Sequence, residues 1–266
     1  MDITTSDYQR FCQLLETQSG ILLGDNKQYL VESRLTNFIK NNQLDSLSEL
    51  TTEISKASGR HLLQKVVDQM TTNETLWFRD GYPFEYMRKE LIPNFSKQGR
   101  FRIWCAACSS GQEPFSIAML LDQSSASGTE IIASDLSSKI LEKANKGVYQ
   151  DIELKRGLPN DKLKRYFNQV DEISWQIKPS LKSQIRFNSL NLLDLPYRQG
   201  QFEIIFCRNV LIYFSQDNKT KVLDGLINSL KPGGYLFLGA SESLTRDCKP
   251  LEMVRCNPGL VYRKSL

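Results

Sequence analysis

The chain has 266 residues, of which 40% are hydrophobic and 24% charged, and 34 basic against 30 acidic side chains give a formal net charge of +4. This length allows one large or two modest domains with a buried core, and so small and mixed a charge gives no reason to expect nucleic acid as a partner. The polar start of the chain, together with the lack of any apolar run of about 18 residues, predicts a cytoplasmic protein without membrane insertion.

Residues 1–70 have the pattern of an all-helical domain. Apolar residues recur at helical spacing in four segments, 7–20, 28–41, 47–57 and 61–70. Gly20 is expected to end the first helix, and Ser46 or Ser48 to cap the third. Arg34 lies in the second helix, where the sequence favours a solvated surface charge over a residue that faces a partner.

Residues 71–99 connect this helical part to the rest of the chain. Trp77 and Phe78 are large apolar residues on a connector, and we expect them to anchor a contact between domains. A helix should follow from Tyr82 and end near Pro93.

Residues 101–118 have the pattern of a buried strand, a loop of small residues and the start of a helix. In an open α/β sheet, this is where a nucleotide-like ligand reaches the backbone and the free N–H groups of a helix N-terminus. The loop has one glycine, Gly111, in place of G-x-G-x-x-G, and Glu113 stands where it would repel a pyrophosphate. A carboxylate here prefers a cation, so we expect a positively charged nucleoside.

Two thiols in this stretch, Cys105 and Cys108, have the C-x-x-C spacing of a redox or zinc pair. The chain has six cysteines, but no second pair has matching spacing and His61 is the only histidine. A chain of this length does not need a disulfide framework. We therefore expect small buried thiols and no bound metal, with a metal or redox pair as the alternative.

From Phe101 onward strands and helices alternate, which is typical of a parallel sheet. Strands are expected at 101–106, 130–134, 184–187, 202–207 and 235–238, and helices at 137–147 and 222–230, the last stopped by Pro232. Asp135, which follows the second strand, could take two ribose hydroxyls, cap the next helix, or do both.

The end and the middle of this region depart from the alternation. A turn signal at 257–259 predicts a final hairpin and hence one antiparallel strand, which is the plan of seven-stranded S-adenosylmethionine-dependent methyltransferases rather than of dehydrogenases. Between Gly147 and Gln184 we expect a small antiparallel insertion with its tip near 168–174.

Six stretches then carry a resemblance to one family. They are NETLWFR (73–79), AACSSGQEPFS (106–116), ASD (133–135), NLL (191–193), FCRNVLIYF (206–214) and LKPGGYLFLGASE (230–242). In order and in kind they resemble the CheR chemotaxis receptor methyltransferases. The resemblance implies an α/β, Rossmann-like seven-stranded methyltransferase fold with an N-terminal helical domain and a small antiparallel β insertion.

The resemblance also implies a division of the chain and an activity. Residues 1–70 would recognise the receptor, 71–99 would link the domains and contribute to the donor site, and 100–266 would form the catalytic domain, with a β-subdomain at about 148–188. The enzyme would be a protein-glutamate O-methyltransferase that transfers methyl from S-adenosyl-L-methionine to chemoreceptor glutamates. The products would be glutamyl methyl esters, which adapt the chemotaxis signal, and S-adenosyl-L-homocysteine.

The implied partner is the cytoplasmic helical bundle of chemoreceptors, gripped by the N-terminal helices, Arg34 included. Some relatives also bind a pentapeptide at a receptor's C-terminus by strand addition. Here residues 167–191 are compact and their tip lacks glycine, so we favour recognition that does not depend on the pentapeptide. We expect a cytoplasmic monomer.

Carried over residue by residue, the resemblance assigns ten site residues. Asn73, Thr75 and Arg79 would contact the methionine end of the donor, and Glu113 would bind its α-amino group. Asp135 would bind the ribose, and Asn191 and Leu192 the adenine. Arg208 and Asn209 would form the pocket floor, and Tyr213 and Arg79 would be the catalytic residues nearest the methyl group. Glutamate has a reference pKa of about 4.3 and is already an anionic nucleophile at neutral pH, so no histidine base is needed.

The expected chemistry depends on charge and alignment. Because a sulfonium and a carboxylate neutralise each other as they react, a water-poor, well-aligned site favours the transition state. Arg79 should therefore orient the other carboxylate oxygen or the donor's own carboxylate rather than grip the attacking oxygen.

Two other functions stay open at this stage. One is a methyltransferase for small molecules or nucleic acids, although residues 207–210 read CRNV where base-modifying amino methyltransferases have N/D-P-P-Y/F. The other is a domain that binds S-adenosylmethionine as a sensor without turnover.

Overall fold

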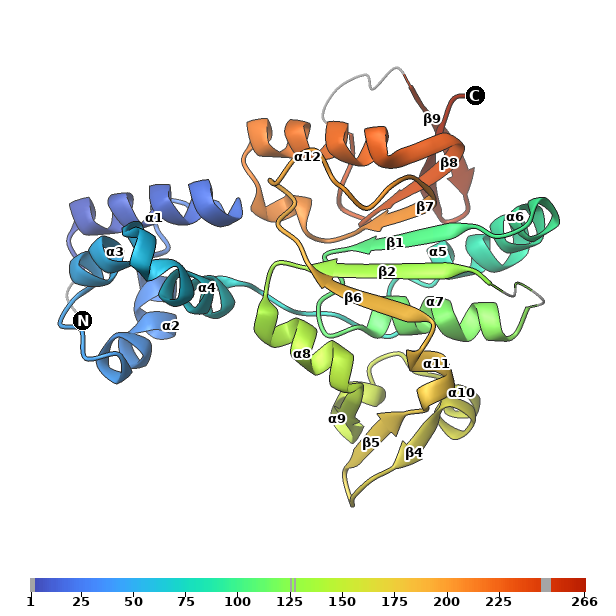
Figure 1. Ribbon diagram of the computed structural model, residues 1–266, viewed down its shortest axis with the longest axis horizontal. Helices are drawn as coiled ribbons and strands as arrows, with labels where there is room; N and C mark the ends of the chain where they lie inside the picture. Colours follow the sequence, from blue (N-terminus) through green and yellow to red (C-terminus); the bar gives the residue numbers. More distant parts are fainter. Residues whose placement is uncertain (1–2, 125, 127, 245–249) are drawn as a thin grey trace.

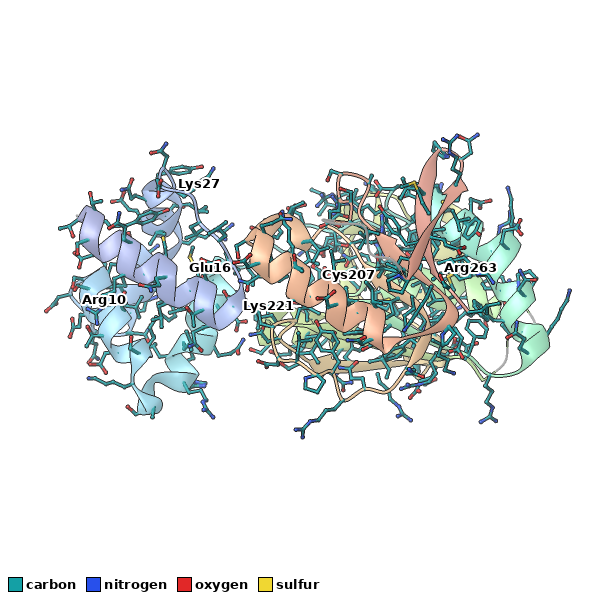
Figure 2. The ribbon with its side chains drawn as sticks, turned by 90° about the horizontal axis from the view of Figure 1, so that it is seen from above. Arg10, Glu16, Lys27, Cys207, Lys221 and Arg263 are labelled. Atoms are coloured by element: carbon teal, nitrogen blue, oxygen red, sulfur yellow. The ribbon has the colours of Figure 1, made fainter. Side chains whose placement is uncertain are left out.

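The computed structural model describes residues 3–124, 126, 128–244 and 250–266; Cys248 lies outside these ranges. A group of N-terminal helices lies beside a larger α/β body (Figure 1). The C-terminal end of the first helix, α1, lies next to the start of α12 on the sheet (Figures 1 and 2). Among the described residues, no helix is both long and apolar enough to cross a membrane.

The N-terminal part contains four α-helices, as predicted. They are α1 (Thr5–Ser19), α2 (Gln28–Asn41), α3 (Leu47–Ser55) and α4 (Arg60–Met70), with a 3-10 turn η1 (Ala57–Gly59) before the last. Gly20 ends α1 in the left-handed conformation, with φ +78°. Ser46, not Ser48, caps α3, because its hydroxyl accepts a hydrogen bond from the Glu49 N–H at 3.1 Å. Phe11, Leu35 and other apolar residues on the inner faces form a separate core.

The helix after the connector does not stop at Pro93, so that prediction was wrong. Helix α5 (Tyr82–Tyr86) continues through a π-helical turn η2 (Met87–Leu91) into α6 (Ile92–Gln98). The π turn changes the hydrogen-bonding register of the backbone, and Pro93 then falls in the first turn of α6, where a missing N–H is tolerated.

Seven strands form one sheet, which confirms the predicted fold class. They are β1 (Arg102–Ala106), β2 (Glu130–Asp135), β6 (Ile185–Ser189), β7 (Phe202–Cys207), β8 (Leu230–Leu238), β9 (Leu251–Cys256) and β10 (Gly259–Lys264). Their order is β6-β2-β1-β7-β8-β10-β9, and β10 is antiparallel to both of its neighbours. The chain order reverses between β1 and β7, which is the switch point where such sheets bind ligands.

Side chains alternate between the two faces of the sheet and build two cores. Ile103 and Cys105 face a core shared with α5, α6 and α7 (Gln112–Asp122), whereas Trp104 and Ala106 face α12 (Gln216–Ser229). The β2 strand leads into α8 (Ser138–Lys146), which is capped by Ser137 and ended by Gly147. Cys207 lies deep in the α/β body (Figure 2).

The transition from α12 to β8 corrects a second expectation about proline. Helix α12 begins at Gln216 and ends at Ser229, so it is Leu230, not Pro232, that ends it. The register against β7 shifts between the pairs at Phe202 and Ile204, and Pro232 lies in the irregular part of β8 that this shift creates. A proline is acceptable there because no regular ladder bond requires its N–H.

The insertion forms the small antiparallel sheet that was predicted. It contains β3 (Val148–Gln150), α9 (Asp151–Leu154), α10 (Asn160–Tyr166), β4 (Phe167–Gln169), β5 (Ser174–Ile177) and α11 (Pro179–Lys182), with strand order β3-β5-β4. Trp77 packs edge-on against Tyr149 and Phe167, with ring centroids 5.0 and 5.5 Å apart. Phe78 contacts Phe84. Both therefore fasten the connector to the α/β body, and the expected contact with the helical domain was wrong.

Candidate active site

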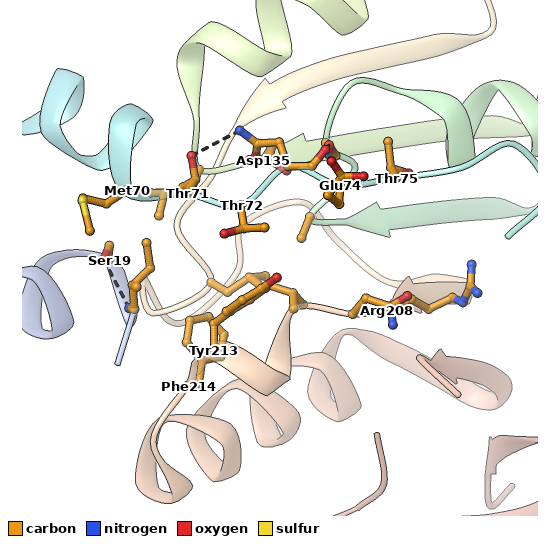
Figure 3. A pocket seen from close by; sticks show the side chains of 18 of the residues that line it. Ser19, Met70, Thr71, Thr72, Glu74, Thr75, Asp135, Arg208, Tyr213 and Phe214 are labelled. Carbon is orange, nitrogen blue, oxygen red and sulfur yellow. Dashed lines mark hydrogen bonds between the residues drawn. The ribbon is translucent and has the colours of Figure 1, made fainter. Parts of the chain in front are cut away.

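A cavity of about 320 Å³ lies between the helical domain and the carboxyl edge of the sheet, a size typical of ligand sites. All ten residues assigned from the sequence line it: Asn73, Thr75, Arg79, Glu113, Asp135, Asn191, Leu192, Arg208, Asn209 and Tyr213. Tyr213 and Phe214 form the wall opposite Thr71 and Thr72, and Arg208 lies at the other end from Ser19 (Figure 3).

Unusual backbone conformations surround the cavity. Six described residues other than glycine have positive φ. Three of them, Ala107, Ser109 and Asn209, line the cavity, and Phe78 and Asp80 flank Arg79. Such conformations are costly for residues with a Cβ and persist where the surrounding structure imposes them, often at functional sites.

Asp135 is held by backbone donors at the end of β2. Its Oδ1 accepts from the Ser137 N–H at 3.0 Å and its Oδ2 from the Ser109 N–H at 2.8 Å. Burial raises the pKa of Asp135 above its ordinary value, and these hydrogen bonds oppose the rise. Ser137, not Asp135, caps α8, because its hydroxyl accepts from the Ile140 N–H. Each oxygen of Asp135 keeps capacity for a further donor such as a ribose hydroxyl.

Arg208 connects two carboxylates at the bottom of the site. Its Nη1 donates to Glu113 Oε2 at 2.9 Å, and its Nη2 donates to Asp80 Oδ2 at 2.6 Å and to the Arg79 carbonyl at 3.0 Å. Only 2% of the Arg208 side chain is exposed, so its pair with Glu113 is buried, whereas the Asp80 side chain is 29% exposed and its pair lies at the edge of the buried region. Burial raises the pKa of Glu113, while Arg208 opposes that rise. Burial disfavours the Arg208 cation, but Glu113 and Asp80 outweigh it and raise the pKa of Arg208.

Asp80 belongs to the site although no sequence motif predicted it. Its only sequence signal is its position directly after Arg79, at the end of the NETLWFR stretch. Its partner, Arg208, is 128 residues away in the chain.

Arg34 helps to place the connector that forms one wall of the cavity. Its Nη1 donates to the Met70 carbonyl at 2.7 Å and its Nη2 to Thr72 Oγ1 at 3.1 Å. The solvated surface charge favoured from the sequence is therefore wrong, because Arg34 is half-buried and bonded to the connector. Further along, Ser109 Oγ donates to the Asn73 carbonyl at 2.9 Å, which joins the connector to the loop after β1.

A second unpredicted residue, Glu242, orders the loop that carries Tyr213. Its Oε2 accepts from the N–H groups of Asn209 and Gly239, both at 2.7 Å, and its Oε1 accepts from the Ile212 N–H at 3.3 Å. The carboxylate of Glu242, a residue that follows β8, thus accepts hydrogen bonds from the backbone at the start of the 3-10 turn η3 (Leu211–Tyr213). Glu242 ends the LKPGGYLFLGASE stretch, but nothing local in the sequence indicates this contact.

The helical domain contributes directly to the cavity wall. The Leu22 N–H donates to the Tyr213 carbonyl at 2.8 Å, and Asn191 Nδ2 donates to the Gln18 carbonyl at 2.8 Å. The amide nitrogen of Asn191, which the resemblance assigns to adenine, is therefore engaged by α1. A Cβ at Gly20 would lie 2.3 Å from the Phe214 ring, so the two domains meet closely here.

Cys105 and Cys108 are both buried, as predicted. Burial raises the pKa of both thiols well above the ordinary value, which favours the inert protonated form. Within the described ranges, no group of three or more His, Cys, Asp or Glu side chains is placed to hold a metal ion.

The lining fits a positively charged nucleoside better than a pyrophosphate. Glu113 presents a carboxylate in the first turn of α7 and Asp135 another at the end of β2, and Arg208 is already paired. The remaining wall includes apolar side chains that suit an aromatic base, among them Ile21, Leu22, Met70, Leu136, Leu190 and Leu192. These residues could hold the adenosyl and amino acid parts of S-adenosylmethionine together.

Comparisons with known proteins agree with this geometry. Residues 73–260 match the family described as CheR methyltransferase, SAM binding domain, and residues 6–71 match CheR methyltransferase, all-alpha domain.

Individual relatives are similar over almost the whole chain. Chemotaxis protein methyltransferase Cher2 of Pseudomonas putida is 46% identical, with 97% of each chain covered. Chemotaxis protein methyltransferase 1 of Pseudomonas aeruginosa is 45% identical, with 99% of each covered. Chemotaxis protein methyltransferase of Vibrio parahaemolyticus is 45% identical, with 98% of each covered.

Proposed function

Since the chain belongs to the CheR family of S-adenosylmethionine-dependent chemotaxis protein methyltransferases, we propose that it methylates glutamate side chains of chemoreceptors. The observation that carries this proposal is that ten residues from the connector and from the segments at or after the ends of β1, β2, β6 and β7 line one cavity. The cavity combines carboxylates suited to a cationic donor with Tyr213 and Arg79, which can position a second substrate.

S-adenosylmethionine, when bound, supplies a methyl group on a positively charged sulfur. Glu113 would bind its α-amino group, and Asp135, fixed by two backbone N–H groups, would accept from the ribose hydroxyls. Asn73, Thr75 and Arg79 on the connector would surround the methionine end. Since the side-chain nitrogen of Asn191 is bonded to Gln18, we propose that the apolar wall at Leu192 provides most of the adenine contact.

No residue of the chain needs to act as a general base, because a receptor glutamate is already ionised at neutral pH. What the chain must supply is alignment and exclusion of water. Tyr213 is held by the loop on Glu242 and by the bond from Leu22 to its carbonyl. Within the part of the chain that the structure describes, the Arg79 side chain makes a single hydrogen bond, a long one of 3.4 Å to the Glu74 carbonyl, so its guanidinium keeps donors for a carboxylate. We propose that these two residues position the receptor glutamate.

We further propose that residues 1–70 recognise the receptor, that 71–99 link the domains and help to bind the donor, and that 100–266 carry out catalysis in the cytoplasm as a monomer. The small sheet, proposed as a subdomain over about 148–188, supports recognition that does not depend on a terminal pentapeptide. Its edge strands β3 and β4 are only three residues long and offer little backbone for strand addition.

The experiment that tests the function uses methyl-labelled S-adenosylmethionine with chemoreceptor-containing membranes. We expect base-labile methyl ester on the receptor, and loss of label when the receptor's candidate glutamates are changed to alanine. Label on nucleic acid or small molecules, or donor binding without any transfer, would contradict the proposal. Titration with the receptor's terminal pentapeptide tests the mode of recognition, because tight binding would contradict independence from it.

A further inference from the structure

Asp80 provides a second carboxylate that pairs with Arg208, which also pairs with Glu113. Its Oδ2 lies 2.6 Å from Arg208 Nη2, a shorter contact than the 2.9 Å from Nη1 to Glu113. Asp80 adopts φ +68°, a left-handed conformation that is uncommon outside glycine and that aspartate tolerates better than most residues. Its carbonyl also accepts from the Tyr82 N–H at 2.6 Å, which ties this turn to the start of α5.

The contact with Asp80 determines how Arg208 meets Glu113. A free guanidinium prefers to bind a carboxylate with two parallel N–H bonds, which would occupy both oxygens. Here Nη2 is taken by Asp80 and the Arg79 carbonyl, so Arg208 reaches only Oε2 of Glu113. Within the described residues the buried Nε of Arg208 has no hydrogen-bond partner, so the two terminal nitrogens alone hold the group in place.

The contact also determines the charge that a ligand meets. Glu113 and Arg208 alone would form a neutral pair, and an incoming ammonium group would meet a buried cation next to the carboxylate. With Asp80 the three groups carry a net charge of −1, and one ammonium brings them to neutrality. Arg79 is the other cation that acts on Glu113. Its side chain is partly exposed, as is that of Asp80, so solvent screens both charges more than it screens Arg208.

We propose that Asp80 is a positioning residue that makes the site selective for the α-ammonium group of the donor. By holding Nη2 of Arg208, it leaves one oxygen of Glu113 without a bond from Arg208 and adds one unit of negative charge for that group. The Cys105 thiol also bonds to Glu113, but a thiol is a weak, uncharged donor and does not neutralise the carboxylate. This inference rests on the proposed function, in which Glu113 binds the α-amino group.

The test is calorimetric binding of two ligands to the purified full chain. S-adenosylhomocysteine carries the α-amino group, and its deamino analogue keeps the carboxylate but lacks the amine. We expect Asp80→Asn to weaken S-adenosylhomocysteine by roughly tenfold, as for loss of a charge-assisted contact, and the deamino analogue by less than about twofold. Glu113→Gln should show the same selectivity. Asp122→Asn is the matched control, because Asp122 pairs with Arg165 outside the cavity, and it should change neither affinity.

The outcomes separate the inference from its premise. Suppose that Glu113→Gln weakens S-adenosylhomocysteine more than the deamino analogue, but Asp80→Asn weakens both ligands equally or weakens neither. The role of Asp80 is then overturned, while the proposed function stands. If Glu113→Gln is not selective, the placement of the amine is wrong and the inference falls with it. If the unchanged protein does not bind S-adenosylhomocysteine, the proposed function itself fails.

A second pair of variants covers the case in which Asp80→Asn does not fold. Asp80→Glu keeps the charge and Asp80→Ser removes it. Preference for the amine in Asp80→Glu and its loss in Asp80→Ser support the proposal, and equal behaviour of the two overturns it.

Discussion

Removing the Glu242 carboxylate should lower both the stability and the turnover of the enzyme. The Glu242→Ala variant leaves three backbone N–H groups without their acceptor, two of which, on Asn209 and Gly239, are bonded at 2.7 Å. A hydrogen bond to a charged group contributes about 1.5–3 kcal/mol, and water can replace part of it at this half-buried position. We therefore expect a loss of about 2–3 kcal/mol of unfolding free energy.

The functional effect should follow from displacement of Tyr213. A loop that loses its acceptor at Asn209 and Ile212 no longer holds Tyr213 in one position, and a tenfold fall in kcat corresponds to only about 1.4 kcal/mol. We expect kcat to fall at least about tenfold in Glu242→Ala and less in Glu242→Gln, since an amide oxygen can still accept from Asn209.

Urea denaturation followed by tryptophan fluorescence, and methyl transfer at saturating donor, measure the two effects. Glu252→Gln on strand β9 is the control, and it should behave like the unchanged protein. If Glu242→Ala keeps full turnover, Glu242 does not position Tyr213, and if Glu242→Gln is as impaired as Glu242→Ala, the hydrogen-bond explanation is wrong.

Three further predictions concern other parts of the cavity. Arg79→Ala should cut turnover while calorimetry still detects donor binding, and unchanged turnover would remove Arg79 from a catalytic role. Burial raises the pKa of Asp135 above its ordinary value of 3.8, so the folded state keeps a proton that the unfolded state releases. The contribution of Asp135 to the free energy of unfolding therefore falls as pH rises from about 4 through the folded pKa. Asp135→Asn should reduce this fall in the free energy of unfolding, measured by denaturation between pH 4 and 7, and it should weaken donor binding. An unaltered slope of stability against pH would contradict a raised pKa in the folded state. Gly20→Ala should destabilise the protein by about 1–3 kcal/mol, because Gly20 has a positive φ and a Cβ there would collide with Phe214. Gly24→Ala is the control and should not destabilise it, because a Cβ at Gly24 meets nothing within 4 Å. Equal unfolding midpoints for the two variants would contradict the proposed domain contact.

Local patterns predicted the elements well because helices and strands leave periodic signals. The limits of α2, 28–41, agree with the prediction, and the final hairpin follows its turn signal. Two helix ends that were predicted from prolines were wrong. Pro93 is accommodated by a π-helical turn and Pro232 by a register shift against β7, and both depend on how the chain packs rather than on the residues beside the proline.

The strand-end part of the site could also be predicted. Asp135, Asn191, Arg208 and Asn209 each follow a strand, and the carboxyl ends of parallel strands meet at one edge of a sheet. The resemblance to a family added Asn73, Thr75 and Arg79 on the connector. What each of these side chains contacts was not predictable, as Arg34 shows: its bonds to Met70 and Thr72 replace the expected solvent.

The sequence alone therefore determined the fold class, and it predicted the edge of the sheet at which the cavity lies. Only the tertiary structure decided that Asp80 shares Arg208 with Glu113 and that Glu242 orders the loop of Tyr213. It also decided that α1, through Gln18, and the segment after α1, through Leu22, close the cavity. The physical reason is that periodicity records the contacts of neighbours in the chain, whereas these contacts join segments that only folding brings together.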